Sequence, residues 1–138
     1  MAELRDTPGK RRIEVLLVDD DELFVESLRA LVDDQPSLSV AGTAVNGLEA
    51  IELVEELAPA AVVIDVHMPL LDGVTTVARM RRDHPALCLI VMTADGKEEL
   101  HQAVSEAGAD AVLMKDDLAA RLHHEITSAH ADRLAAAV

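Results

Sequence analysis

The chain has 138 residues, a length that suits one domain with a sizeable apolar core. Half of its residues are hydrophobic, yet Phe24 is the one Phe, Tyr or Trp, so the core must be built from aliphatic side chains and Met. With 26 acidic against 12 basic residues, the formal net charge is −14, which argues against direct nucleic-acid binding and suits a protein that attracts metal cations.

The N-terminal segment 1–12 is polar and lacks the apolar part of a signal peptide. No apolar stretch approaches the ~20 residues that cross a membrane. The single cysteine, Cys88, excludes a disulfide within the chain and is expected to be a small buried hydrophobe. We therefore expect residues 1–12 to be a flexible lead-in, and the protein to be cytoplasmic with no membrane partner.

Five short apolar runs alternate with five segments whose apolar residues recur at helical spacing. The strand runs are continuous rather than alternating in polarity, as is typical of strands buried on both faces of a parallel sheet. The predicted strands are 13–18, 38–41, 61–65, 87–92 and 111–114, and the helices that follow them lie around 23–32, 46–57, 74–83, 100–107 and 118–129. We predict an α/β fold with a doubly wound, five-stranded parallel sheet in the order 2-1-3-4-5, flavodoxin-like, with five helices.

The segment 61–73, AVVIDVHMPLLDG, carries an acid at the end of a buried strand. A carboxylate such as Asp65 is costly to bury unless it has a partner or lies at a solvent-open edge. The C-terminal edge of a parallel sheet is such a place, and open α/β folds bind their ligands there. Met68-Pro69 is predicted to end the strand, and Asp72-Gly73 to make a turn.

Polar residues end four of the predicted strands at this same edge: Asp19 and Asp20, Asp65, Thr93 and Lys115. Two carboxylates ~4 Å apart repel by on the order of 4 kcal/mol at an intermediate dielectric, so a cation must offset them. Mg²⁺ prefers oxygen ligands and leaves room for a phosphoryl group. With a cationic Lys115 and the hydroxyl of Thr93, the set predicts transfer of a phosphoryl group onto Asp65.

Four stretches resemble the motifs of the receiver domain of two-component response regulators: VLLVDDDELF (15–24), VVIDVHMPLLDG (62–73), IVMTADG (90–96) and AGADAVLMKDD (107–117). The resemblance covers about 13–126. It implies that Asp65 is the phosphoacceptor for a sensor histidine kinase, with Thr93 and Lys115 bonding the phosphoryl group. The implied Mg²⁺ ligands are Asp19, Asp20, Asp65 itself and the backbone carbonyl of His67.

The resemblance also implies how the signal is timed and transmitted. His67 and Asp95 occupy positions where family side chains tune the lifetime of the aspartyl-phosphate. The face formed by the fourth helix, the fifth strand and the fifth helix is expected to change and to control a partner or output domain. Thr93 and Val112 are the switch positions, and Val112 replaces an aromatic residue that many receivers carry, so the output coupling is expected to differ.

Lys115 is followed by Asp116 where many receivers have proline, as in regulators with a helix-turn-helix output of the nitrate-regulator type. The last predicted helix could continue from residue 118 to 137, roughly 30 Å. We expect a receiver over residues 13–130 and a helix extension or linker over 131–138. We hypothesise that this extension mediates a homodimer or joins a further domain.

Two alternatives remain open. A phosphatase of the haloacid dehalogenase type also uses Asp, Mg²⁺, Thr and Lys, but that family has Asp-x-Asp-x-Thr or Val, whereas Leu23 follows Asp19-x-Asp21 here. A pseudo-receiver would fold alike and act by protein contact alone, although all five family positions are filled. We expect a signalling receiver that is not an enzyme beyond its own Mg²⁺-dependent phosphorylation and dephosphorylation.

Overall fold

The structure, a computed structural model, describes residues 12–67 and 72–137. The predictions for residues 1–11 and for Met68-Pro69 lie outside the described residues. The elements, in chain order, are β1 (Ile13–Val18), α1 (Glu22–Asp33), β2 (Leu38–Ala44), α2 (Gly47–Leu57), β3 (Ala61–Asp65), α3 (Gly73–Asp83), β4 (Cys88–Thr93), α4 (Glu98–Ala107), β5 (Ala111–Met114), the 3-10 turn η2 (Lys115–Asp117) and α5 (Leu118–Ala137).

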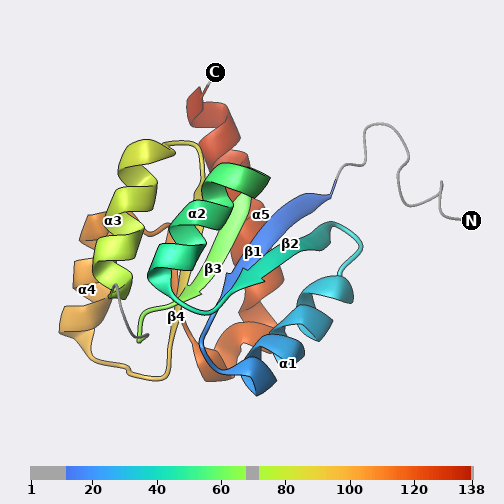
Figure 1. Ribbon diagram of the computed structural model, residues 1–138, viewed down its shortest axis with the longest axis horizontal. Helices are drawn as coiled ribbons and strands as arrows, with labels where there is room; N and C mark the ends of the chain where they lie inside the picture. The colour runs from blue at the N-terminus through green and yellow to red at the C-terminus, as the bar shows by residue number, and fades with distance from the viewer. Residues whose placement is uncertain (1–11, 68–71, 138) are drawn as a thin grey trace, which may run out of the picture.

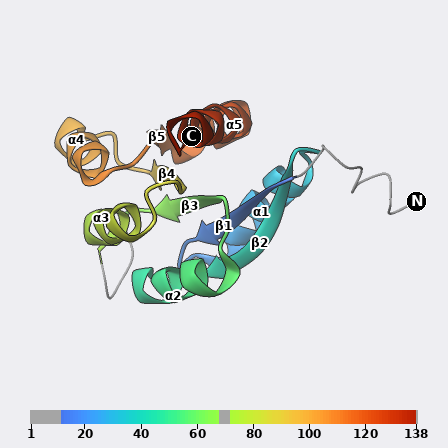
Figure 2. The same cartoon turned by 90° about the horizontal axis from the view of Figure 1, so that it is seen from above.

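The strands form one parallel sheet in the order β2-β1-β3-β4-β5, which confirms the predicted topology (Figure 1). Helices α1 and α5 cover one face, and α2, α3 and α4 cover the other, as the view from above shows (Figure 2). Two apolar cores lie between these layers. The β1 and β3 side chains that alternate along each strand enter opposite cores, so both strands are buried on both faces.

Polar side chains cap the N-termini of α1 and α2, and a glycine ends α4. Asp21 begins α1 by accepting the amide protons of Leu23 and Phe24, and Asn46 accepts that of Glu49 at the start of α2. Gly108 ends α4 with φ of 120°, a conformation that suits glycine. The two N-terminal caps fix where α1 and α2 begin, a few residues after the ends of β1 and β2.

Strand β2 is longer than the predicted 38–41 because it continues to Ala44 through pairing with β1. The register shifts so that Val15 is opposite Val40 and Leu16 is opposite Gly42, which leaves Ala41 as the extra residue of a bulge. Gly42 and Thr43 have no strong strand pattern of their own, so the neighbouring strand decides their conformation.

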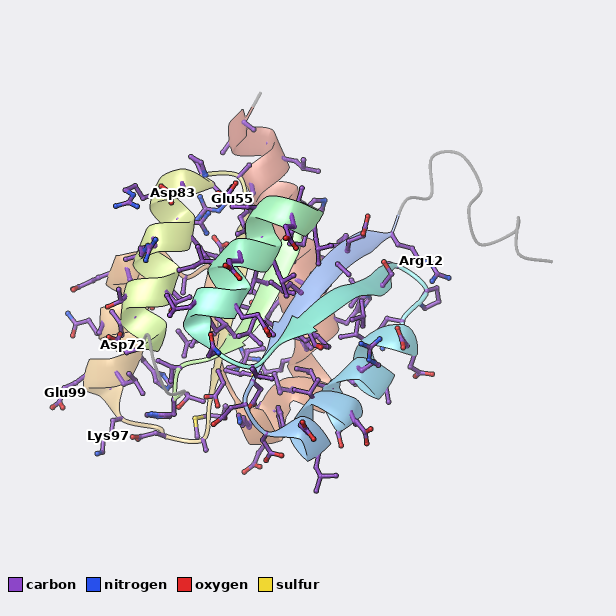
Figure 3. All side chains as sticks on the ribbon, viewed as in Figure 1. Arg12, Glu55, Asp72, Asp83, Lys97 and Glu99 are labelled. Atoms are coloured by element: carbon purple, nitrogen blue, oxygen red, sulfur yellow. The ribbon has the colours of Figure 1, made fainter. Side chains whose placement is uncertain are left out.

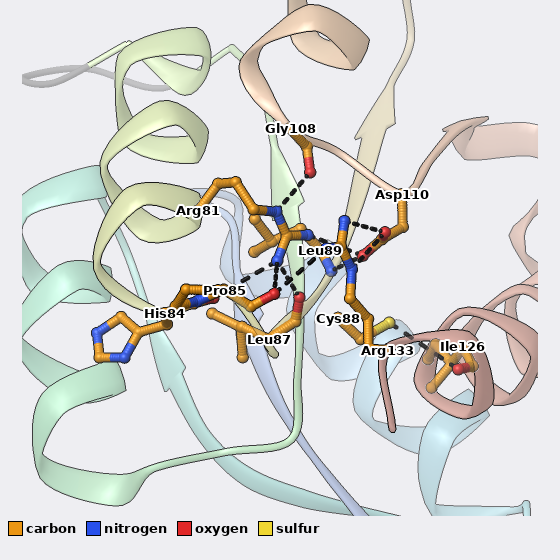
Figure 4. A network of polar contacts seen from close by, with 10 residues as sticks. All are labelled: Arg81, His84, Pro85, Leu87, Cys88, Leu89, Gly108, Asp110, Ile126 and Arg133. Atoms are coloured by element: carbon orange, nitrogen blue, oxygen red, sulfur yellow. Dashed lines mark hydrogen bonds and ion pairs between the residues drawn. The ribbon is translucent and has the colours of Figure 1, made fainter. Parts of the chain in front are cut away.

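Asp110 joins three segments at the N-terminal edge of the sheet (Figure 4). Its carboxylate accepts hydrogen bonds from Arg81 Nη2 and from the amide of Leu89, each at 2.9 Å. It also accepts two from Arg133, from Nε at 2.9 Å and from Nη2 at 2.7 Å. Arg81 also donates to the carbonyl of Gly108 at 3.0 Å. The network fixes the last turns of α5 to the connections that precede β4 and β5.

The C-terminal edge lies at the other end of the molecule. In Figure 3, Asp72 and Lys97 lie near the starts of α3 and α4, while Glu55 and Asp83 lie at the opposite end. None of the helices within 12–67 and 72–137 has the length and apolar character needed to cross a membrane.

Candidate functional site

The C-terminal edge of the sheet gathers the residues that the sequence places at its strand ends. Asp19 follows β1, Asp65 ends β3, Thr93 ends β4 and Lys115 follows β5. Asp19, Asp65 and Thr93 are 1%, 4% and 0% exposed. Buried polar groups at this depth need partners, and the following contacts supply them.

Lys115 joins the two buried carboxylates. Its Nζ lies 2.8 Å from Asp19 Oδ2 and 3.3 Å from Asp65 Oδ2. The other oxygen of each carboxylate accepts a backbone N–H, from Asp21 to Asp19 Oδ1 at 2.9 Å and from His67 to Asp65 Oδ1 at 3.0 Å. Asp65 is therefore held from two sides, with one oxygen toward the lysine.

Asp20 completes an acidic cluster with Asp19 and Asp65. One carboxylate oxygen from each of the three residues lies within 4.8 Å of the others, and Asp20 is exposed to solvent. An all-oxygen set with an open side fits a hard divalent cation such as Mg²⁺. Through its amide, His67 contacts Asp65, and the metal-ligand role of its carbonyl stays a prediction.

The surroundings of Asp65 and Lys115 include groups that raise their pKa values and groups that lower them. Burial raises the pKa of Asp65; the His67 amide and Lys115 oppose that rise, and the Asp19 charge adds to it. Burial lowers the pKa of Lys115, but its hydrogen bond to Asp19 and the charges of both acids outweigh burial and raise the pKa overall. The lysine is thus held as a cation beside the acids.

Thr93 has its hydroxyl turned toward its own loop. Its Oγ1 accepts the Asp95 amide at 2.9 Å and donates to the Asp95 carbonyl at 3.3 Å. Asp95 in turn accepts the amide of Lys97 with its carboxylate at 2.9 Å. Val112 is half-buried on β5 and packs against the core beneath α2, α3 and α4. The tuning role of Asp95 and the switching roles of Thr93 and Val112 stay predictions.

Phe24 belongs to the site, although it was not among the predicted site residues. Its ring centroid lies 4.2 Å from Lys115 Nζ. The signal that could have found it is compositional: a single aromatic in an aliphatic chain, close after a run of acids.

A doubly wound sheet with buried acids and a lysine at its C-terminal edge defines the class of two-component signal receivers. The chain belongs to the response regulator receiver domain family, which matches residues 15–127. It is therefore a receiver domain of two-component signalling.

Solved structures agree. A LuxR-family response regulator from Aurantimonas sp. SI85-9A1 is 27% identical, with a TM-score of 0.83 over 88% of this chain and 87% of that chain. The response regulator domain of Thermotoga maritima CheB is also 27% identical, with a TM-score of 0.80 over 87% of this chain and 97% of that chain. The signal receiver domain of a Mycobacterium tuberculosis regulator named NarL is 26% identical, with a TM-score of 0.77, covering 88% of this chain and 95% of that one.

Curated relatives correct one prediction. A protein of Methanospirillum hungatei JF-1 named protein-glutamate methylesterase/protein-glutamine glutaminase 2 is 40% identical over 75% of this chain and 30% of its own length. A protein of Geobacillus kaustophilus named protein-glutamate methylesterase/protein-glutamine glutaminase is 36% identical over 74% of this chain and 30% of its own length. The chain thus spans about a third of such relatives.

The prediction that the protein is not an enzyme is wrong in the light of these names, because both relatives are named as enzymes. The physical reason for the error is that the receiver motifs lie at the strand ends that form the receiver's own site, and they predict only the chemistry of that site. The matched residues, 15–127, cover the receiver alone, so they could not predict the enzymatic activity named in these relatives.

Proposed function

We propose that Asp65 is the phosphoacceptor of this receiver. The observation that carries the proposal is the position of its Oδ2, 3.3 Å from Lys115 Nζ at a solvent-open edge. The other oxygen is engaged by the His67 amide, so Oδ2 is the nucleophile. It attacks the phosphorus of the donor's phosphohistidine, the P–N bond breaks, and the imidazole leaves.

The remaining residues prepare this transfer. Asp19, Asp20 and Asp65, whose carboxylates gather here, would hold Mg²⁺ together with the His67 carbonyl, and the bound ion would neutralise charge on the phosphoryl oxygens. Lys115 provides a second positive charge beside the same oxygens. Thr93 exchanges its bonds with Asp95 for one to the phosphoryl group, which moves the β4–α4 connection.

The proposal extends to partners and timing. The phosphodonor is a sensor histidine kinase, as the family resemblance implies, and the chain acts in the cytoplasm. His67 and Asp95 tune hydrolysis of the aspartyl-phosphate, and the face of α4, β5 and α5 transmits the change with Val112 in place of an aromatic residue. Residues 13–130 form the receiver. The extension over 131–138, of which the structure describes 131–137, contacts a second copy or a further domain, which the exposure of Leu134 supports.

The output is open to two proposals. The 40% identity to a protein named as a methylesterase favours a receiver that controls such an enzyme. The Lys115-Asp116 pair favours a helix-turn-helix output of the nitrate-regulator type. The sequence encoded around this segment in the gene distinguishes them.

Incubation with acetyl phosphate and Mg²⁺, followed by intact mass spectrometry, tests the phosphoacceptor. The wild-type chain should gain one phosphoryl group, and a chelator should abolish the gain. Asp65→Asn should remain unmodified, whereas Asp34→Asn, an exposed acid that ends α1, should behave as wild type. Unchanged phosphorylation of Asp65→Asn, or none in the wild type, would refute the proposal.

A further inference from the structure

The ring of Phe24 lies against the charged end of Lys115, with the ammonium 4.2 Å from the ring centroid. Phe24 is in the first turn of α1, and its amide donates to the capping carboxylate of Asp21 at 3.2 Å. The cap therefore fixes the backbone from which the ring projects. Phe24 also packs against the core shared by α1 and α5, so the ring has little freedom to turn away.

Three partners surround the Lys115 ammonium. Two are the carboxylates of Asp19 and Asp65 at 2.8 and 3.3 Å, and the third is the Phe24 ring. An aromatic face attracts a cation through its quadrupole without adding net charge. A third acid at this place would increase the repulsion within the acidic cluster and bind the lysine too firmly to release it.

We propose that Phe24 is a positioning residue for Lys115. Its ring holds the ammonium at the edge of the acidic cluster while the lysine moves from Asp19 toward a phosphoryl group on Asp65. The ring face attracts the ammonium without accepting one of its directional hydrogen bonds, so the lysine can exchange Asp19 for the phosphoryl group while it stays over the ring. The proposal rests on the phosphoacceptor role of Asp65 proposed above.

An aliphatic side chain would leave the lysine less restrained. The lysine side chain has four methylene groups and loses rotamer freedom when its end is fixed. Besides Phe24, the shallow pocket beside this lysine is lined by Ser27 and by aliphatic side chains such as Leu28 and Leu118. The hydrogen bonds of the ammonium go to Asp19 and Asp65. On this side of the site, the contact with the ammonium that the structure shows is therefore the one with the ring.

The composition gives a direct test. Because Phe24 is the only phenylalanine, a chain produced with fluorinated phenylalanine carries the label at this position alone. Successive fluorines weaken the negative face of the ring and change its shape little. The rate of phosphorylation by acetyl phosphate should fall stepwise from mono- to trifluorophenylalanine, about two- to fivefold in all, which corresponds to ~0.5–1 kcal/mol.

Phe24→Leu should show a loss of the same size, and Phe24→Tyr should keep most of the wild-type rate because it retains the aromatic face. A purely structural role predicts no trend along the fluorinated series. A second measurement does not depend on phosphorylation: the melting temperature of the metal-free chain should fall with fluorination in the wild type but not in the Lys115→Met background.

The outcomes separate the two proposals. A wild-type chain that gains no phosphoryl group refutes the proposed function, and the positioning role fails with it. A wild-type chain that is phosphorylated at equal rates throughout the fluorinated series overturns the role of Phe24 alone. Equal effects of fluorination on melting temperature with and without Lys115 would also overturn it.

Discussion

Lys115 Nζ lies 2.8 Å from Asp19 Oδ2, an ion pair that links the segment after β5 to the end of β1 across the two intervening strands. Asp19 is fully buried at its side chain and Lys115 is 20% exposed, so water screens the pair only in part. The same ammonium faces Asp65. One cation therefore balances the carboxylates on both central strands, and any metal ion bound there competes with it.

Lys115→Met should bind Mg²⁺ more tightly while accepting phosphate more slowly. Loss of the ammonium leaves Asp19 and Asp65 more attractive to a divalent cation, by about tenfold, or ~1.4 kcal/mol, in affinity. The phosphoryl oxygens lose a positive partner, so the rate with acetyl phosphate should drop. Isothermal titration calorimetry and intact mass spectrometry measure the two effects.

Lys97→Met is the matched control for that change. Lys97 is 75% exposed and lies 3.8 Å from Asp95 rather than among the acids of the cluster. Its removal deletes the same charge nearby and should leave Mg²⁺ affinity within about twofold of wild type, since exposed pairs contribute little. Equal gains in affinity for both variants would show that net charge, not the contact with Asp19, controls the metal.

Gly73→Ala should destabilise the protein and disturb the site. A Cβ at Gly73 would lie 2.5 Å from Val66 Cα, so the backbone beside Asp65 must move. Alanine is favoured over glycine in a helix by up to ~1 kcal/mol. Overpacking against Val66 costs ~1–3 kcal/mol, so the variant should be less stable overall. Urea denaturation gives the stability, and faster hydrogen exchange of the His67 amide would report the loosened contact to Asp65.

Gly96→Ala separates this effect from the general cost of losing a glycine. A Cβ there would lie 3.8 Å from the end of Met114, an ordinary contact. Stability should change by less than ~0.5 kcal/mol. A Gly96→Ala variant as unstable as Gly73→Ala would contradict the packing argument.

The fold and the acidic part of the site were predictable because their signals are local. The apolar runs that end in Asp19 and Asp65 mark both the strands and the polar residues at their ends, and parallel pairing brings those ends to one edge. The order 2-1-3-4-5, predicted from the alternation of strands and helices, makes the first and third strands neighbours and so brings both acids together. The pairing of β1 with β3 confirms that reasoning.

The contacts that remained unpredicted join residues far apart in the chain. Arg81, Asp110 and Arg133 each occur in helical or loop sequence with no pattern that relates them, and the folded sheet brings them together. The position of Phe24 over Lys115 likewise depends on how α1 packs beside the end of β5. Such contacts follow from tertiary packing, which residue periodicity does not encode.

Asp110→Asn should cost ~2–4 kcal/mol of stability. The side chains of Arg81 and Asp110 are 16% and 14% exposed, so removing the carboxylate charge leaves Arg81 partly buried without its partner. Arg133 also loses its bidentate contact, so amide exchange should accelerate in the last turns of α5. Glu125→Gln, which alters the exposed pair with Arg121, should cost only a few tenths of a kcal/mol.

Cys88→Ala should make the stability less sensitive to alkaline pH. Burial raises the pKa of the Cys88 thiol from 9.0 to about 12, so the folded chain keeps the proton that the unfolded chain releases above about pH 9. Stability is therefore lost as the pH rises between these values, by up to ~1.4 kcal/mol per pH unit. The alanine variant is less stable near neutral pH because it lacks the packed sulfur, but its disadvantage should shrink by that amount as the pH rises. Urea denaturation followed by circular dichroism at about pH 8, 10 and 11 measures both slopes, and parallel slopes would show that the thiol ionises alike in the folded and unfolded chains.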